Sequence, residues 1–273
     1  MRKSKILGLI AALGVSFGLS TAAHADLLAD IKAKGKIVAA TEMHFAPFDI
    51  LKDGKYEGIC ADLFTEVGKE LGVEVEFLDL PWQSILPGLE AGKFDFVNAP
   101  VTITAERAQR YSFTLPIADA TVALVKKAGD DSIQKPADIA GKAIGSQKGS
   151  AQLAQLKAYS ETLPTPVDVR EYVNIDEALA DLAAGRIQGV ANSLPLMGYA
   201  SVQRPNLFEL VLPPFGEPKY FAWVARPGDE TKTLIEAINA ALVKMHEDGR
   251  FDAINKKWLG KAPEVPTTMP EVK

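Results

Sequence analysis

Two stretches decide the fold: LPGLEAGKFDFV at residues 86–97 and LADLAAGRIQGV at residues 179–190 are near echoes of each other. Each ends a helix-like run in Ala-Gly and then continues into a short strand-like run. Glycine directly after a helical segment is a common stop signal. The echo therefore predicts that the same helix-to-strand unit occurs twice, once in each of two similar lobes.

Strand-like and helix-like runs alternate around the first stretch, which is the pattern of an α/β sheet protein. Val67 and Leu71 belong to an apolar helical face that Gly72 ends. Pro87 interrupts or kinks the helix that contains it. The expected strands are 36–42, 73–78 and 94–99, and the expected helices are 61–72 and 82–93.

The same order returns around the second stretch. Asn174 stands three residues before Glu177, a spacing typical of a capping box at a helix start. The expected strands are 121–127, 142–146, 167–172 and 187–192, with helices from about Ser150 and over 174–185, and the C-terminal part adds a strand at 220–225 and helices at 229–249 and 250–260.

Two extended, proline-containing segments, near 116–121 and 213–220, are expected to cross between the lobes. Two lobes joined by two extended strands form a hinge with a cleft, and ligands of open α/β sheets bind outside the carboxyl ends of the strands. We therefore expect lobe 1 at 26–117 and 218–260, lobe 2 at 118–217, and a Pro-rich tail at 261–273.

The N-terminus has the pattern of a secretory signal peptide. Three basic residues precede an uncharged, mainly apolar run from Ile6 to Leu19, and Ala23-His24-Ala25 forms a small-residue cleavage site. The run is short for a membrane span, which needs about 20 residues. We expect cleavage after Ala25 and export to the periplasm.

Charge and cysteine content exclude several classes of function. Cleavage would remove Arg2, Lys3 and Lys5 from the 30 basic residues and none of the 35 acids, which changes the formal net charge from -5 to -8. Such a chain has no basic patch for nucleic acid. Cys60 is the single cysteine and reads as a small core residue, and the remaining histidines have no metal-ligand spacing. We expect neither metal nor cofactor.

The segment TITAER at 102–107 carries the chemistry that points to a carboxylate ligand. Thr102 ends a strand, and Thr104 can cap the helix that follows, which leaves Arg107 in its first turn. Arginine is the planar, always-charged side chain that holds a carboxylate through two parallel hydrogen bonds. An ordinary surface arginine is the alternative.

The chain resembles the extracytoplasmic solute-binding proteins of family 3, the amino-acid-binding components of bacterial ABC importers. The resemblance covers nearly the whole mature chain. It rests on the segments FAPFDI (45–50), GKYEGICADL (54–63), PWQSILPGLEAGKFD (81–95), TITAER (102–107), DIAGKAIGSQKGS (138–150), LAAGRI (182–187) and DGRFDAINKKWLG (248–260). It implies the type II periplasmic-binding-protein fold, with two α/β domains, a two-strand hinge and a ligand cleft between them.

The resemblance also implies a set of ligand contacts. It makes Arg107 the carboxylate clamp, with Thr102 on the same ligand group and the Ala151 N–H reaching it from lobe 2. Ser150 either contributes to this or only caps its helix. Phe45 and Trp82 would enclose the ligand side chain, and Glu42, at the end of the first strand, would face its distal end. Ala99 and Pro100, shortly before Thr102, complete the set. Phe45 and Trp82 can instead be core, and Glu42 can be a solvated acid; if it faces the cleft, it favours a ligand with a cationic tail.

One departure from the family bears on the ligand. The resembling proteins usually present an aspartate to the α-ammonium group, in a stretch where this chain has GRIQGVANS at 185–193. Gln188 and Ser193 stand in place of the acids. Either Glu42 or Asp119 takes over the ammonium, or the preferred ligand is an N-substituted or non-α-amino carboxylate, or the pocket tolerates Ser193 and binds ordinary amino acids weakly.

The function that the resemblance implies is the capture of an amino acid or a similar small carboxylate by hinge closure. The partner would be a cognate ABC permease in the inner membrane, and the protein would act as a monomer without catalysis. The alternative is a dehydratase for cyclic acids such as prephenate or arogenate on the same fold, which would need an acid catalyst facing the cleft.

Overall fold

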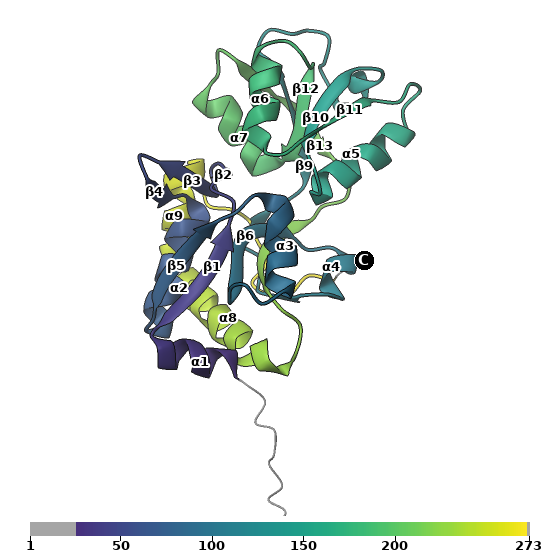
Figure 1. Ribbon diagram of the computed structural model, residues 1–273. Coiled ribbons are helices and arrows are strands. Elements are labelled where there is room, and N and C mark those ends of the chain that lie inside the picture. Colours follow the sequence, from purple (N-terminus) through teal and green to yellow (C-terminus); the bar gives the residue numbers. More distant parts are fainter. Residues whose placement is uncertain (1–25, 272–273) are drawn as a thin grey trace, which may run out of the picture.

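The strands form two main sheets that lie one above the other in Figure 1, each at the centre of its own lobe. The computed structural model describes residues 26–271, so the expected signal peptide at 1–25 lies outside the described residues. In lobe 1, the lower lobe in Figure 1, the sheet order is β5-β1-β6-β14-β7, and β8 also pairs with β14. These strands are β1 (Lys36–Thr41), β5 (Glu74–Asp79), β6 (Phe96–Thr102), β7 (Ser112–Phe113), β8 (Ala118–Asp119) and β14 (Tyr220–Ala225).

The two faces of the lobe 1 sheet are covered by different helices. The helix expected at 61–72 is α2, whose buried face includes Leu63, Val67 and Leu71 and whose end is set by Gly72 in the left-handed conformation. It packs with α8 and α9, whereas α3 covers the opposite face through Trp82 and Ile85. The helices are α1 (Leu27–Lys34), α2 (Ile59–Leu71), α3 (Trp82–Glu90), α4 (Ala105–Ala108), α8 (Lys232–Glu247) and α9 (Arg250–Leu259), with a 3-10 turn, η2, at Asp229–Thr231.

Lobe 2 repeats the arrangement with a five-stranded sheet in the order β11-β10-β12-β9-β13. β10 runs parallel to β11 and β12, and β9 runs antiparallel to β12 and β13. Ser150 and Asn174 cap the helices expected after them. The elements are β9 (Val122–Lys127), η1 (Pro136–Ile139), β10 (Ala143–Gln147), α5 (Ala151–Glu161), β11 (Asp168–Tyr172), α6 (Ile175–Ala183), β12 (Gly189–Ser193), α7 (Leu194–Gln203) and β13 (Phe208–Phe215).

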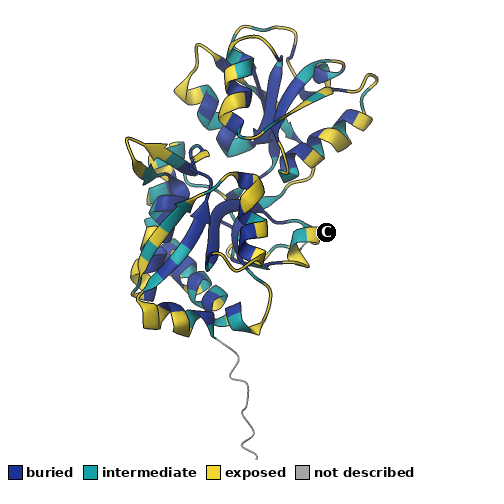
Figure 2. Ribbon diagram, viewed as in Figure 1, coloured by how far each residue is buried: buried dark blue, intermediate teal, exposed yellow. Residues whose placement is uncertain are grey.

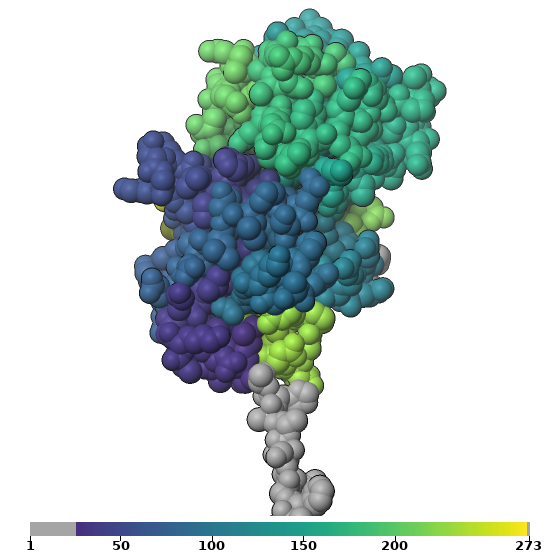
Figure 3. Space-filling view, viewed as in Figure 1, coloured from purple at the N-terminus to yellow at the C-terminus, as the bar shows by residue number. Residues whose placement is uncertain are grey.

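The chain crosses between the lobes twice, from β8 to β9 and from β13 to β14. The crossings lie side by side, because β8 pairs with β14 and the Ala120 N–H donates to the Lys219 carbonyl at 2.8 Å. In the space-filling view of Figure 3, the two lobes contact each other on the face of the molecule that is shown. The central strands of both sheets are buried (Figure 2). Among residues 26–271, no helix has the length and apolar character needed to cross a membrane.

A small sheet lies on lobe 1 at its border with lobe 2 and supports a group of aromatic rings. It consists of β2 (His44–Phe45), β3 (Asp49–Lys52) and β4 (Lys55–Glu57). Phe45, Phe48 and Phe221 meet here, with ring centroids 5.4 to 6.2 Å apart. The loop carrying Phe48 is held against the start of α2, where the Cys60 N–H donates to the Phe48 carbonyl at 2.9 Å.

Gly58, at the start of α2, permits this close approach. Its φ of 130° is a conformation that other residues rarely adopt, and a Cβ at this position would lie 2.3 Å from the Phe48 carbonyl oxygen. By contrast, a Cβ at Gly72, at the other end of α2, would meet no atom within 4 Å, although φ is also positive there.

The substitution Gly58→Ala is therefore expected to reduce the free energy of unfolding by at least about 3 kcal/mol, since it adds a clash with the backbone to an unfavourable φ. Gly72→Ala, which changes φ preference alone, should cost only about 1 kcal/mol. Urea denaturation of both variants measures the difference. Equal losses would show that the contact with Phe48 is not what requires glycine at position 58.

Candidate ligand-binding site

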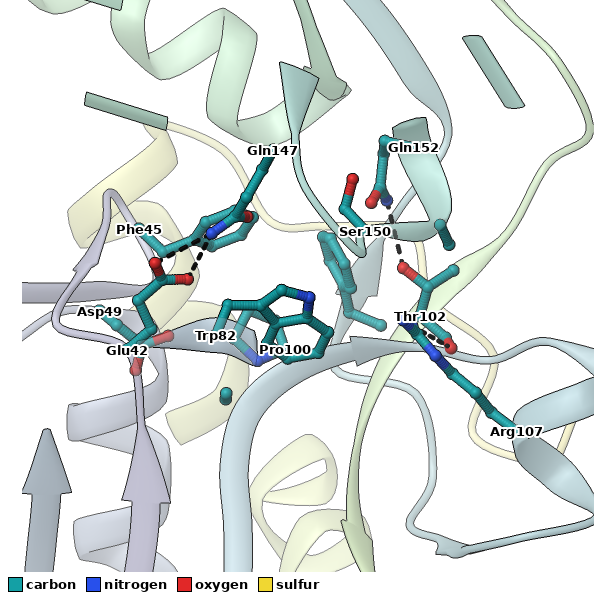
Figure 4. Close-up of a pocket in the computed structure, with 13 residues that line it drawn as sticks. Glu42, Phe45, Asp49, Trp82, Pro100, Thr102, Arg107, Gln147, Ser150 and Gln152 are labelled. Carbon is teal, nitrogen blue, oxygen red and sulfur yellow. Dashed lines mark hydrogen bonds between the residues drawn. The ribbon is translucent and has the colours of Figure 1, made fainter. Parts of the chain in front are cut away.

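A pocket lies between the two lobes and takes residues from both. It encloses about 330 Å³ of space not filled by atoms, part of it open to solvent. Figure 4 shows it with Glu42 and Gln147 at one end, Thr102 and Arg107 at the other, and Trp82 and Pro100 between them. The lining residues are Glu42, Phe45, Asp49, Trp82, Ala99, Pro100, Thr102, Arg107, Gln147, Ser150, Ala151, Gln152 and Phe221.

Arg107 is held in place by the turn that follows β6. The Thr104 hydroxyl accepts from the Arg107 N–H at 3.2 Å and caps α4. The guanidinium donates to the Thr102 carbonyl at 3.3 Å and, across the cleft, to the Gly149 carbonyl at 3.2 Å, and its carbon lies 5.4 Å from the centre of the Trp82 ring. Because α4 has only four residues, its dipole is small, so the positive charge at this end of the pocket is that of Arg107 itself.

The guanidinium is poorly solvated and has no acidic partner. Burial lowers the pKa of Arg107 to about 10, which still leaves it charged at neutral pH. No ion pair to Arg107 forms within residues 26–271; its hydrogen bonds go to backbone carbonyls. The arrangement leaves a partly buried cation with donors available for an anion that the protein does not supply.

Lobe 2 meets this end of the pocket with the start of α5. The Gln152 amide donates to the Thr102 hydroxyl at 3.2 Å and to the Ala120 carbonyl at 3.0 Å, so it joins lobe 2 to β6 and to the first crossing. Ser150 caps the helix by accepting from the Leu153 N–H at 3.0 Å. The first N–H groups of a helix have no partner within it, and Ala151 opens α5 at the pocket wall.

Glu42 and Gln147 form the second contact between the lobes inside the pocket. The Gln147 amide nitrogen lies 2.9 and 2.7 Å from the two carboxylate oxygens of Glu42. Both side chains are buried, with 5% and 2% of their surface exposed. Burial is the main cause that raises the pKa of Glu42 to about 7, and the negative charges of Asp176 and Asp79 add to it against the Gln147 hydrogen bond.

Asp49 provides a second carboxyl group at the Glu42 end. Tyr56 donates its hydroxyl to one Asp49 oxygen, and the Asn98 amide donates to the Tyr56 hydroxyl at 3.1 Å. The other Asp49 oxygen is buried without a hydrogen-bond partner. Burial raises the pKa of Asp49 to about 8, and the neighbouring charge of Glu42 contributes to the shift.

Nine of the ten residues predicted as ligand contacts line this pocket. Phe45 and Trp82 line the pocket and also belong to the core of lobe 1, and their contact with a ligand stays a prediction. Ser193 is the exception. It ends β12 opposite Val122, fully buried, and its hydroxyl has no hydrogen-bond partner and no surface in the pocket.

Asp119 also stays out of the pocket, because its carboxylate is used within the hinge. One oxygen accepts from the Thr121 N–H at 2.7 Å and the other from the Thr121 hydroxyl at 3.2 Å. Four lining residues were not predicted, namely Asp49, Gln147, Gln152 and Phe221. In the part of the chain that the structure describes, no group of three His, Cys, Asp or Glu side chains is placed to hold a metal ion.

Comparison with known proteins agrees with this geometry. Residues 37–261 match the model of the bacterial extracellular solute-binding proteins, family 3. The chain is 29% identical over 262 residues to the L-cystine-binding protein TcyJ of Escherichia coli K12, covering 94% of this chain and 96% of that protein. It is 28% identical over 259 residues to a probable amino-acid ABC transporter-binding protein of Haemophilus influenzae, covering 94% and 97%.

Among solved structures, an ancestral arginine-binding protein bound to arginine superposes with a TM-score of 0.75 at 35% identity, covering 83% of this chain and 99% of that one. The chain belongs to family 3 of the bacterial extracellular solute-binding proteins. The two-lobed α/β fold predicted from the sequence is confirmed. The family and these relatives are solute-binding proteins and not enzymes, so the dehydratase alternative is not supported.

The raised pKa of Glu42 predicts how stability depends on pH. Because the folded chain keeps this proton up to about pH 7 whereas the unfolded chain loses it near 4.5, the folded state binds more protons between these values, and the unfolding free energy falls as the pH rises through that window. Glu42→Gln should remove the part of this loss that Glu42 causes, whereas Asp49, whose pKa is also raised, keeps its own part. Without added ligand, the variant should be more stable than the parent at pH 8, by on the order of 2 kcal/mol, and nearly equal to it at pH 4.5.

Urea denaturation at half-unit steps from pH 4.5 to 8 measures this effect. Glu161→Gln, an exposed acid at the end of α5, is the matched control and should leave the pH dependence unchanged. A parallel pH dependence of Glu42→Gln and the parent would contradict the burial of an ionisable carboxyl group at position 42.

Proposed function

We propose that this protein captures a small carboxylate-bearing solute, an amino acid or a close relative of one, in the pocket between its lobes. It acts in the periplasm as a monomer, after removal of residues 1–25, and delivers the solute to a cognate permease in the inner membrane. The observation that carries the proposal is the partly buried Arg107 guanidinium, which forms no ion pair within residues 26–271 and lies between two lobes that both contribute to the pocket.

In this proposal the solute carboxylate pairs with Arg107. The Thr102 hydroxyl and the Ala151 N–H lie on the same pocket wall and complete its hydrogen bonds. Ala99 and Pro100 contribute backbone surface, Ser150 orders the start of α5, and Phe45, Trp82 and Phe221 enclose the hydrocarbon part of the solute. Such a site, apolar with a few convergent polar groups, is typical of small-molecule pockets.

The opposite end of the pocket favours a positive charge on the solute. Glu42 and Asp49 both line it, and the charges of Asp79 and Asp176 act on Glu42 from β5 and from α6. His44, 3.8 Å from Asp176, is the neighbouring base. A cationic tail would favour the ionised form of Glu42 and would gain from pairing with it. The similarity to an arginine-binding protein also supports a positive charge on the solute.

Arg107→Ala should weaken binding of the solute by at least about 30-fold, because the carboxylate would then be buried without its partner. Arg107→Lys keeps the charge but not the two parallel donors, so its affinity for the solute should lie between those of Arg107→Ala and the parent. Isothermal titration with the tightest member of a panel containing L-arginine, L-lysine, L-histidine, L-cystine and L-glutamine measures the loss. Circular dichroism should show both variants folded, and an affinity within threefold of the parent for Arg107→Ala would refute the assignment.

Closure of the lobes is expected to accompany binding. Three polar contacts join the lobes within the pocket, from Gln147 to Glu42, from Gln152 to Thr102 and from Arg107 to Gly149. A solute that contacts both lobes would add further contacts between them and favour a closed arrangement. Small-angle scattering should therefore show a smaller radius of gyration with saturating solute than without it. Arg107→Ala at the same solute concentration is the control and should show no compaction. An unchanged radius for the parent would indicate lobes that do not move.

A further inference from the structure

The charged groups of the pocket lie at opposite ends, and this separation restricts the solute further than the proposed function does. Figure 4 shows Glu42 beside Gln147 on one side of Trp82, and Arg107 beside Thr102 on the other. An α-amino acid carries its ammonium and its carboxylate on the same carbon atom. If Arg107 binds the carboxylate, the ammonium must therefore lie at the Arg107 end, within reach of Thr102, Ser150 and Gln152.

That end of the pocket offers no carboxylate to an ammonium group. Its lining residues are Pro100, Thr102, Arg107, Ser150, Ala151 and Gln152. Their oxygens are neutral, and both hydroxyls already accept one hydrogen bond: the Thr102 hydroxyl accepts from Gln152 and the Ser150 hydroxyl from the Leu153 N–H. The carbonyls of Thr102 and Gly149 accept from Arg107, which would also repel a second cation.

The two side chains that could have replaced a missing acid are placed elsewhere. Asp119 holds Thr121 with both of its oxygens. The Ser193 hydroxyl is buried outside the pocket at the end of β12. An ammonium brought into this end would lose its water without gaining a charged partner, at a cost in affinity of about 30-fold or more.

The other end of the pocket, at Glu42, does contain acidic side chains. Glu42 has both oxygens within hydrogen-bond distance of one amide nitrogen, that of Gln147, which a cationic group can displace. Asp49 lies in the same part of the pocket with one buried oxygen that has no partner. A guanidinium or ammonium group placed there would meet the carboxyl group of Glu42, with the fully buried Asp49 beside it, and the ring of Trp82 lies between this position and Arg107 (Figure 4).

We propose that the preferred solute is a carboxylate with its cationic nitrogen at the far end of the chain and no free α-ammonium group, in the class of ω-guanidino and ω-amino carboxylates. This inference rests on the proposed function, since it takes the carboxylate at Arg107 as its starting point. Arg107 binds the carboxylate, the apolar walls enclose the methylene chain, and Glu42 with Asp49 binds the terminal nitrogen.

Matched pairs of ligands that differ only in the α-amino group test the inference on the unaltered protein. The pairs are L-arginine with 5-guanidinopentanoate, L-lysine with 6-aminohexanoate, and L-ornithine with 5-aminopentanoate. Isothermal titration at pH 8 should give a dissociation constant at least tenfold lower for the compound without the α-amino group in the best-binding pair. Equal or tighter binding of the α-amino acid in that pair would overturn the inference.

A variant separates this inference from the proposed function. Glu42→Gln should weaken 5-guanidinopentanoate or 6-aminohexanoate at least tenfold and change the binding of hexanoate, which has no cation, less than threefold. An equal loss of affinity for the carboxylate with a terminal cation and for hexanoate would overturn the assignment of Glu42 to the terminal nitrogen. Tight binding of a neutral amino acid that depends on Arg107 would overturn the inference and leave the proposed function standing, whereas loss of dependence on Arg107 would remove both.

Discussion

A charge that leaves water needs a partner, and this constraint governs the pocket and the relation between the lobes. Arg107 is partly buried beside Trp82, and its hydrogen bonds go to backbone carbonyls. Glu42 and Asp49 are buried at the other end, where the same loss of water raises their pKa values. The protein thus encloses a cation and two acids without bringing them together. In the proposed function the solute supplies the missing partners, so the features that make these charges costly would make the filled pocket stable.

The same residues connect recognition with closure. Gln147 and Gln152 belong to lobe 2, and each contacts a lobe 1 side chain that lines the pocket, Glu42 and Thr102 respectively. A solute that engages Glu42 must displace the Gln147 amide or share the carboxylate with it, so the contact between the lobes and the contact with the solute use the same atoms. Discrimination between solutes therefore acts on the energy of the closed form and not on one lobe alone.

The sequence was sufficient for the fold and for most of the pocket. The repeated Ala-Gly segment predicted two α/β lobes because helix ends and strands have local signals, whereas the place of Arg107 in the cleft came from the resemblance to family 3. The lining residues that escaped prediction have no local signal: Asp49 and Gln147 look like ordinary polar residues of their strands, and only tertiary packing brings them to the Glu42 end. Ser193 failed for the same reason, since its place in the chain predicts the end of β12 and not the direction of its hydroxyl. The short β2–β4 sheet was missed because it depends on Gly58 and on packing against Phe221.

The position of β14 has a consequence for the order in which the molecule can be assembled. This strand lies between β6 and β7 in the lobe 1 sheet, yet it follows all of lobe 2 in the chain. It brings Trp223 and Phe221 into the lobe 1 core, and α8 and α9 follow it. Lobe 2 is continuous in sequence from β9 to β13, so during synthesis its strands are all present before lobe 1 can complete its sheet. The part of the chain made first therefore lacks strand β14 of its sheet until all of lobe 2 has been synthesised.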